Sequence, residues 1–328
     1  MIACRCMAKR DRNTDAAALM ALLYVPGVGN GGVRSALRAA RQLQCDVASL
    51  ITKSPRELME TMPPGDHQVL AQAIGNCEES HREAGQRLVA RCAKAGISLL
   101  TIEDDRYPNS VRDQLGERAP AILSVIGHLG LIEQLGVAVV GAREVSDAGR
   151  QLARACGRDV ARTERVLVSG GANGVDDTAQ RGATDAGGGM VVVLPQGLLK
   201  FRGPQYFRDV LREQRILLMS ASLPDAPWQR HAAVERNDMI AALSEAVCVI
   251  EPKKTGGSIR TARTGLEFGR HVLVHCTSDS AQGCTALIRE GARPLCEGET
   301  LGEGWLSKAL ACDSPRVVEQ TSLPGMDQ

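Results

Sequence analysis

The residues of this chain that are best suited to chemistry lie in a glycine-rich loop, Ser169-Gly-Gly-Ala-Asn-Gly-Val-Asp176. The apolar run Val166 to Val168 precedes the loop, and apolar residues at helical spacing follow it, so the pattern predicts a strand, a tight loop and a helix. Glycines let such a loop turn several amides toward one ligand, and the helix start adds partial positive charge. The segment favours a bound anion, most often a phosphate. A ligand-free turn with Asp176 as the helix N-cap is the alternative.

Three further loops follow apolar runs and carry cations or glycines. They are Gly141-Ala142-Arg143, Gln196-Gly197-Leu198-Leu199-Lys200-Phe201-Arg202 and Glu251-Pro252-Lys253-Lys254-Thr255-Gly256-Gly257-Ser258. A sheet without a ligand has no need for cations and glycines to gather at one edge. The four loops together therefore predict an anion-binding edge.

These loops need a scaffold, and the apolar runs before them predict a parallel sheet. The runs are Val137–Gly141, Val166–Ser169, Val191–Leu194, Ile216–Met219, Val247–Ile250 and Val272–His275. Helical patterns of about 12 to 18 residues separate most of them, as in β-α-β units. We expect an α/β fold with a Rossmann-like, doubly wound, mainly parallel sheet. Such sheets bind ligands beyond the carboxyl ends of their strands.

The first part of the chain, residues 1–95, predicts a small all-helical domain of the helix-hairpin-helix or SAM-like kind. An apolar helix at Ala17–Val25 runs into the glycine-rich turn Pro26–Gly32, and helical spacing resumes at Val33. In a helix-hairpin-helix the turn amides contact a DNA phosphate, whereas a glycine turn between packed helices without a ligand is the alternative. A polar helix is predicted from Gln68 to Ala95.

The rest of the chain divides into a sheet domain and a tail. Strands at Ile97–Ile102 and Ala121–Ile126 open the Rossmann-like domain, which we expect to span residues 96–303. Residues 304–328 lose periodicity and predict a tail, and no winged-helix pattern follows residue 303.

Composition limits the function classes. The net charge is +1 with a pI near 7.5, so a nucleic-acid contact needs a local basic patch, and with 2% aromatic residues phosphate contacts should outweigh base stacking. The 11 cysteines are scattered, as expected for reduced thiols, and only Cys4 and Cys6 lie close together, so we expect no metal and no cofactor. No signal peptide and no run of about 18 apolar residues is found. We expect a soluble, cytoplasmic protein without membrane contact.

Taken in order, these segments resemble the DprA family, also called Smf, whose members bind single-stranded DNA and load the RecA recombinase. The resemblance covers residues 15–303. It rests on Val139-Val-Gly-Ala-Arg143, Ser169–Asp176, Arg236-Asn-Asp-Met-Ile-Ala241, Thr255-Gly-Gly-Ser-Ile-Arg-Thr-Ala-Arg263 and Ala286-Leu-Ile-Arg-Glu-Gly-Ala292, with a weaker match at Asp105-Arg-Tyr-Pro108. It implies single-stranded DNA and a RecA-type recombinase as partners, and a homodimer formed through the sheet domain.

The loops and the resemblance together give one set of candidate DNA- or phosphate-binding residues. The set is Gly141, Arg143, Ser169, Gly170, Gly171, Asn173, Lys200, Arg202, Arg236, Asn237, Gly256, Gly257 and Ser258. By resemblance, Arg143 matches an arginine that reaches a DNA phosphate. Lys200 or Arg202 matches the basic residue on the opposite wall. A solvated surface cation is the alternative for each.

The other candidates have structural alternatives as well. The resemblance implies that the paired glycines supply amides and that Ser169 and Ser258 supply hydroxyls, although Ser258 also suits a helix N-cap. Arg236 and Asn237 are expected to open a helix at Met239–Leu243 and to border the pocket. A cap, or an ion pair of Arg236 with Glu235 or Asp238, is the alternative.

The chain departs from the family pattern in ways that bear on function. Asn173 stands where the family usually has an arginine, which removes one positive charge from the pocket, and the loop 196–205 lacks the usual aromatic pattern. These departures leave room for a divergent paralogue, for example one that serves in defence against foreign DNA.

Three functions follow as hypotheses. The first is a non-catalytic single-stranded DNA binder that protects the strand and loads a recombinase in DNA uptake or recombination, since no nucleophile, base or metal cluster stands out. The second is a small-nucleotide sensor or a phosphoribohydrolase-like enzyme, but Thr255–Thr261 lacks the third glycine and the glutamate of that loop. The third, a nicotinamide-dependent dehydrogenase, lacks the Gly-x-Gly-x-x-Gly pattern.

Overall fold

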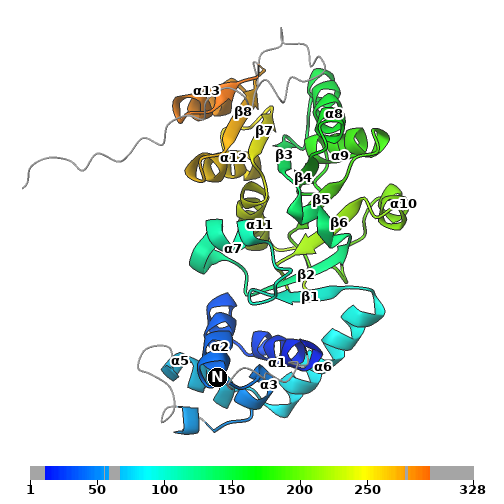
Figure 1. The fold of residues 1–328 in the computed structure, drawn as a ribbon. Coiled ribbons are helices and arrows are strands. Elements are labelled where there is room, and N and C mark those ends of the chain that lie inside the picture. The colour runs from blue at the N-terminus through cyan, green and yellow to red at the C-terminus, as the bar shows by residue number, and fades with distance from the viewer. Residues whose placement is uncertain (1–11, 55, 59–66, 278–279, 296–328) are drawn as a thin grey trace, which may run out of the picture.

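The computed structural model describes residues 12–54, 56–58, 67–277 and 280–295. It contains a helical region, α1 to α6, and an α/β region that follows it from β1 to β9. The helical region lies beneath the sheet in Figure 1, next to β1 and β2. The predicted tail at 304–328 and the pair Cys4 and Cys6 lie outside the described residues.

The helices of the helical region form a small bundle. They are α1 Arg12–Tyr24, α2 Asn30–Gln42, α3 Val47–Leu50, α5 His67–Gly75 and α6 Glu79–Lys94. The predicted helix, glycine turn and helix are α1, the segment 25–29 and α2, and Gly27 adopts the left-handed φ of 82° that this turn requires. Helices α1 and α6 pack backbone against backbone, because a Cβ on Gly85 would lie 2.4 Å from the carbonyl oxygen of Ala17.

The prediction of one helix from Gln68 to Ala95 is wrong, because the chain breaks it into α5 and α6. The amide of Cys77 bonds back to the carbonyl of Ile74, which closes α5. The amide of Glu78 then donates to Nδ1 of His81 at 3.1 Å, and α6 starts afresh at Glu79. Side-chain capping of a new helix start thus outweighs the continuous helical pattern.

The described residues hold a nine-stranded sheet, and the predicted strands are confirmed within one or two residues. The strands are β1 Ser98–Thr101, β2 Ile122–Gly127, β3 Gly136–Gly141, β4 Val166–Ser169, β5 Met190–Leu194, β6 Ile216–Ser220, β7 Ala246–Ile250, β8 His271–His275 and β9 Arg293–Pro294. Their order is β1-β2-β6-β5-β4-β3-β7-β8-β9. Strands β3 to β9 run parallel to one another, while β2 pairs antiparallel with β6 and β1 pairs antiparallel with β2 at one side.

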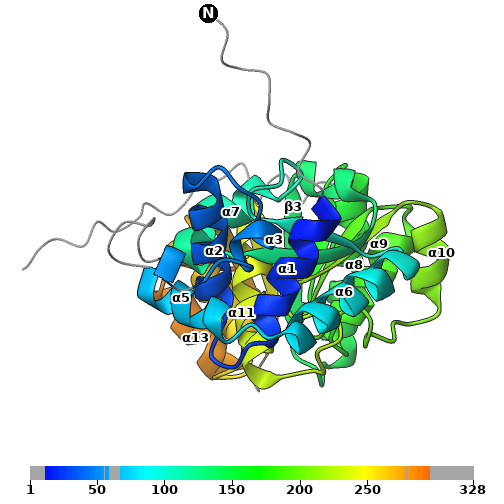
Figure 2. The ribbon, with the colours of Figure 1, turned by 90° about the horizontal axis from the view of Figure 1, so that it is seen from below.

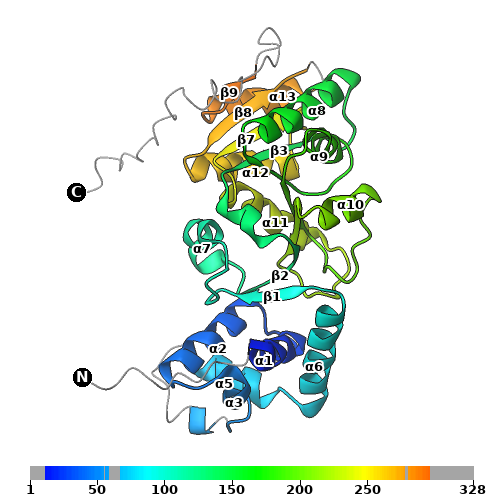
Figure 3. The same cartoon turned by 45° about the vertical axis from the view of Figure 1, so that its right-hand side comes forward.

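Helices cover both faces of the sheet, which confirms the doubly wound α/β prediction (Figure 3). One face carries α8 Asp147–Arg162, α9 Val175–Asp185 and α10 Tyr206–Arg212; the other carries α7 Asn109–Leu115, α11 Arg230–Ala242, α12 Gly257–Glu267 and α13 Ala281–Arg289. Two short 3-10 turns, η1 Gly116–Arg118 and η2 Leu129–Glu133, flank β2. Among the described residues, no helix combines the length and the apolar character needed to cross a membrane.

Alternation along the strands builds two apolar cores. Val137 and Val139 of β3 face the core beneath α8, α9 and α10, whereas Ala138 and Val140 face the core beneath α11 and α12. The first core continues without a break into the helical region, whose α1 and α6 lie in front of the sheet in Figure 2. Burial on both faces explains why these strands are nearly all apolar.

Polar contacts also join the two regions. The side-chain amide of Asn30, the first residue of α2, donates to the carbonyl oxygen of Ala119 at 3.0 Å, and its oxygen accepts from the amide of Ala121. The start of α2 is therefore used to hold the chain that leads into β2. Asn30 lies in the glycine-rich turn Pro26–Gly32 that the sequence offered as a DNA contact. Its side chain is instead used to hold the fold together.

Candidate nucleic-acid interface

The four predicted loops follow β3, β4, β5 and β7, and these strands are parallel, so the loops share one edge of the sheet. The chain builds β4, β5 and β6 on one side of β3 and then crosses back to place β7 on the other side. The switch point between β3 and β7 is where doubly wound sheets open a crevice for ligands. Glu251 ties these two loops together, because its carboxylate accepts from the amide of Ser146 at 3.0 Å and from the Ser146 hydroxyl.

The loop after β4 is built around Arg236 of α11, a half-buried arginine. A Cβ placed on Gly170 would lie 1.4 Å from Nη1 of Arg236, so the guanidinium occupies the space that any larger residue would need. Gly171 takes a left-handed φ of 66°, which turns the chain back over β4 and β5. Both paired glycines are thus required, one by a close approach and the other by its backbone conformation.

Asp176 holds the same loop from behind. Its carboxylate accepts from the amide of Gly170 at 3.0 Å and from the amide of Ala172 at 3.4 Å, and the buried Ser169 hydroxyl lies beside it. The helix N-cap is Gly174, so Asp176 is not the N-cap but a residue of the first turn. The Gly170 amide is therefore engaged within the protein. The amides of Gly171 and Asn173 make no hydrogen bond within the described part of the chain.

Two like charges meet over this loop. Burial lowers the pKa of Arg236, the Asp176 carboxylate opposes that effect, and the nearby Arg143 guanidinium lowers the pKa further. Nε of Arg236 is buried and has no hydrogen-bond partner among the described residues. Burial raises the pKa of Asp176, and Arg236 acts against that rise. The Asp176 carboxylate opposes the charge of Arg236, and Arg143 adds a second positive charge close by, so the site favours an anion.

Arg143 reaches this position through close backbone packing. Gly141 ends β3 where a Cβ would lie 2.1 Å from the carbonyl oxygen of Ile250 in β7. Gly174 presses against the carbonyls of Ala142 and Arg143 in the same way, each 2.4 Å from its Cβ position. The Arg143 side chain itself is exposed. The glycines therefore bring the first two loops together and leave the cation at the surface.

The loop after β7 ends in an open helix start. Gly256 is the N-cap of α12, with a φ of 138° and no side-chain cap, and Ser258 lies inside the first turn. The N-cap alternative for Ser258 is therefore wrong. Asn237 of α11 lies beside this turn, since its Nδ2 atom is 3.1 Å from the Cβ position of Gly257. Helix α9 is also uncapped by a side chain, but its Val175 and Asp177 amides donate to the carbonyls of Ala142 and Ala172, so the start of α12 is the more open of the two helix N-termini at this edge.

Arg236 and Asn237 do not open their helix, as the sequence predicted, because α11 starts earlier at Arg230. Their places in the middle of the helix let one reach Gly170 and the other reach Gly257. The alternative, an ion pair of Arg236 with Asp238, is also absent from the described residues, since Asp238 instead binds Arg260 at 2.7 Å and Arg118 at 3.2 Å. Helix α11 thus joins the two glycine loops.

The loop after β5 carries its cations differently. Lys200 is exposed, while Nη1 of Arg202 folds back onto the carbonyl of Phe201 at 3.1 Å. Three aromatic residues gather here, because Phe207 packs against Phe201 with centroids 6.2 Å apart and against Tyr206 at 4.9 Å. Of the two cations, Lys200 is the one whose side chain makes no contact that holds it against its own loop.

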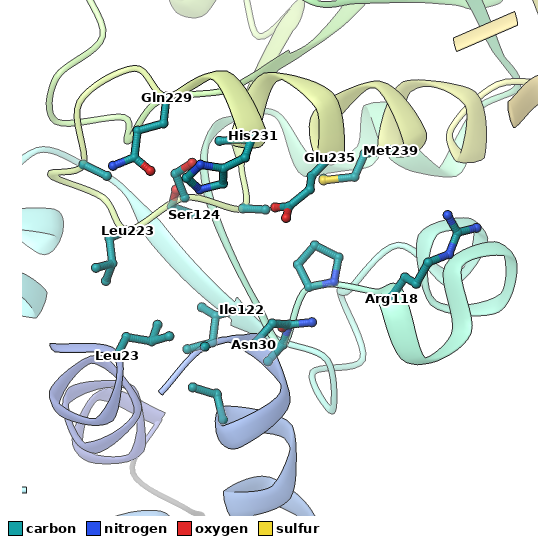
Figure 4. A pocket seen from close by; sticks show the side chains of 18 of the residues that line it. Leu23, Asn30, Arg118, Ile122, Ser124, Leu223, Gln229, His231, Glu235 and Met239 are labelled. Atoms are coloured by element: carbon teal, nitrogen blue, oxygen red, sulfur yellow. The ribbon is translucent and has the colours of Figure 1, made fainter. Parts of the chain in front are cut away.

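A cavity of about 560 Å³ lies farther along the same edge and was not predicted from the sequence. Figure 4 shows its apolar floor, formed by Leu23, Ile122 and Leu223, and its polar roof on the first turns of α11, which includes His231 and Glu235. It lies between the helical region and the α/β region, so only the packing of distant segments creates it. Within the described residues, no group of three or more His, Cys, Asp or Glu side chains is placed to hold a metal ion.

Comparison with known proteins finds DNA-processing proteins as relatives. A family model described as DNA recombination-mediator protein A matches residues 98–305. The DNA processing protein DprA of Bacillus subtilis is 29% identical over 245 residues, which cover 72% of this chain and 80% of the relative. A putative DNA processing protein DprA of Mycobacterium tuberculosis is 30% identical over 265 residues, which cover 75% of this chain and 67% of the relative.

Solved structures agree on the fold. DNA processing protein A from Streptococcus pneumoniae aligns with a TM-score of 0.66 at 24% identity and covers 86% of this chain and 94% of that one. DNA processing protein A from Helicobacter pylori, described for its single-stranded DNA binding mode, aligns with a TM-score of 0.52 at 27% identity, covering 61% of this chain and 90% of that one. The family model spans more than half of the chain, and with these relatives it shows that the chain belongs to the DNA recombination-mediator protein A family of DNA-processing proteins, DprA or Smf.

Proposed function

We propose that this chain binds single-stranded DNA at the carboxyl edge of its sheet. The observation that carries the proposal is the pair Arg143 and Arg236, two guanidinium groups close enough to repel each other, at an edge where the N-termini of α9 and α12 carry no side-chain cap. A phosphate placed there gains charge-assisted hydrogen bonds and relieves the repulsion between the arginines. The relative from Helicobacter pylori, described for its single-stranded DNA binding mode, supports this choice of ligand.

The width of the edge favours a strand over a single small nucleotide. Arg143 follows β3 and Lys200 follows β5, and β4 lies between those strands. Two strand spacings amount to about 10 Å, which exceeds the reach of one phosphate group. Cations at that separation suit successive phosphates of an extended chain.

The acidic residues near the site support binding without catalysis. Asp176 is buried and holds the loop amides. Asp177 binds the guanidinium of Arg181 at 2.9 Å and accepts from the Tyr206 hydroxyl at 3.2 Å. Both carboxylates thus serve the fold, and we propose that the site grips DNA and breaks no bond. By family membership we extend the proposal to delivery of the strand to a RecA-type recombinase and to a homodimer, which light scattering would test.

A salt titration with oligo-dT tests the DNA proposal. We expect log K to fall linearly with log salt, and Arg143→Ala to weaken binding by about 1 to 3 kcal/mol while it reduces the slope by about 0.7, the value for one lost phosphate contact. Arg212→Ala is the matched control, because Arg212 is exposed and precedes β6 at the opposite edge of the sheet. Equal effects of the two substitutions would refute the proposed site.

A gain of charge tests the same pocket in the other direction. Asn173 is exposed in the β4 loop, so Asn173→Arg should fit without repacking and should tighten oligo-dT binding by about 1 kcal/mol with a steeper salt slope. If the protein instead binds a mononucleotide without salt dependence and does not retain oligo-dT, the small-nucleotide sensor replaces this proposal.

A further inference from the structure

The loop between β6 and α11 is shared by the two regions of the molecule. Its Asp225 carboxylate accepts from the Tyr24 hydroxyl of α1, with both oxygens at 3.2 Å, and from Nη1 of Arg91 in α6 at 2.9 Å. The Asp225 side chain is 25% exposed, so these contacts are partly shielded from solvent. Two helices that lie far from the loop in sequence thus hold one of its side chains.

The same loop, residues 221–229, is called the β6 loop here. It supports residues 196–202, the Lys200 loop, from behind. The amide of Leu199 donates to the carbonyl oxygen of Pro224 at 2.8 Å, and the amide of Gly197 donates to that of Ala226 at 3.0 Å. The backbones touch, because a Cβ on Gly197 would lie 2.2 Å from the carbonyl oxygen of Leu223. A shift of the β6 loop must therefore carry the Lys200 loop with it.

Apolar packing also reaches this loop, since Leu223 lies against the core shared with α1 and α6, but the other ion pairs between the regions do not. Arg34 and Arg38 of α2 each lie 3.4 Å from the Glu117 carboxylate, which is 81% exposed and precedes β2. The cavity of Figure 4 separates α1 and α2 from α11 between these two points of contact. Among the described residues, Asp225 makes the hydrogen bonds and the ion pair that connect α1 and α6 to the β6 loop, and thereby to the Lys200 loop.

We propose that Asp225 is a positioning residue through which the N-terminal helices hold the Lys200 loop in place at the DNA site. The inference rests on the proposed function for its effect on DNA, but the mechanical link does not require DNA. The helices thus act on the binding site without contacting the strand at that point. Burial and Asp225 raise the pKa of Tyr24 to about 12, so the hydroxyl remains a donor throughout the neutral range.

Amide hydrogen exchange on the free full-length protein tests the link alone. Asp225→Ala and Tyr24→Phe should each speed exchange at Gly197 and Leu199, because their acceptors on the β6 loop lose support. Glu117→Gln, which weakens the other contact between the regions, should leave those amides unchanged. Tyr24→Phe removes a single hydroxyl, so it keeps the test valid if Asp225→Ala fails to fold. Unchanged exchange in Tyr24→Phe would overturn the proposal.

Oligo-dT affinity tests the effect on the site. Asp225→Ala and Tyr24→Phe should weaken binding by about threefold to tenfold, the range for residues that act through others, while Glu117→Gln should not. In a Lys200→Ala/Arg202→Ala background the same substitutions should have no further effect, because the wall then carries no cation. The same loss in both backgrounds would overturn the positioning role. If the unaltered protein fails to retain oligo-dT, the proposed function fails, and the exchange experiment still decides the link.

Discussion

At the scale of single residues, Gly170 and Arg236 share one small volume. The sequence shows both residues, and the glycine pair predicted the loop correctly. It could not show that the Arg236 guanidinium fills the place of a Gly170 side chain, because that contact joins residues far apart in the chain. Arg236 was also expected to open its helix, since residues Arg230 to Glu235 mix polar and small apolar side chains and show no clear apolar stripe. The residue types that build the loop were therefore easier to predict than the contacts that their side chains make.

Gly170→Ala should displace Arg236 from the site. The added Cβ would lie 1.4 Å from Nη1, and the end of an arginine side chain moves more easily than backbone does. We expect oligo-dT binding to weaken by about 1 to 3 kcal/mol, as for a lost charged contact. A double-mutant cycle with Arg236→Ala checks the cause, because the two losses should not add. Fully additive losses would show that Gly170 acts without Arg236.

At the scale of elements, buried strands were the easiest to predict. The strands β3 to β8 are covered on both faces, so each is an apolar run that ends sharply at glycine or polar residues. Helix ends were harder, because capping contacts decide them. The break between α5 and α6 depends on His81 accepting from the Glu78 amide, which no periodicity shows. The pairing of α1 with α6 likewise follows from a close approach at Gly85 and not from the apolar stripe of either helix.

Gly85→Ala should loosen the pair α1 and α6. Its Cβ would lie 2.4 Å from the Ala17 carbonyl oxygen and 2.8 Å from the Ala21 amide nitrogen, and helix backbone cannot move aside without shifting α1. We expect the free energy of unfolding, measured in urea, to fall by about 1 to 3 kcal/mol. Gly31→Ala in α2 is the control, because nothing lies within 4 Å of its Cβ position. Equal stability of the two variants would contradict the packing of these helices.

At the scale of the whole molecule, each tyrosine joins segments that are distant in the chain. Tyr24 links the helical region to Asp225, and the Tyr107 hydroxyl donates to the carbonyl of Pro120 at 2.8 Å. Tyr206 links α10 to Asp177 in α9. Burial is the largest cause that raises the pKa of all three, to about 12 for Tyr24. A chain with so few aromatic residues thus uses its tyrosine hydroxyls for hydrogen bonds between separate segments.

Alkaline titration tests the three tyrosine contacts together, through the pH at which each hydroxyl ionises. Because each folded-state pKa is raised, the folded chain keeps protons that the unfolded chain releases near pH 10, so the tyrosines stabilise the fold fully below about pH 10 and progressively less above it. Absorbance at 295 nm should therefore show almost no tyrosinate in the folded protein at about pH 10, and all three tyrosines should titrate near that pH in guanidinium. Tyr24→Phe should lessen the loss of stability between about pH 10 and pH 12, because it removes one of the linked groups. About half a tyrosinate per folded chain at about pH 10 would mean that one of these contacts is open in solution, because an unperturbed tyrosine is half ionised at that pH.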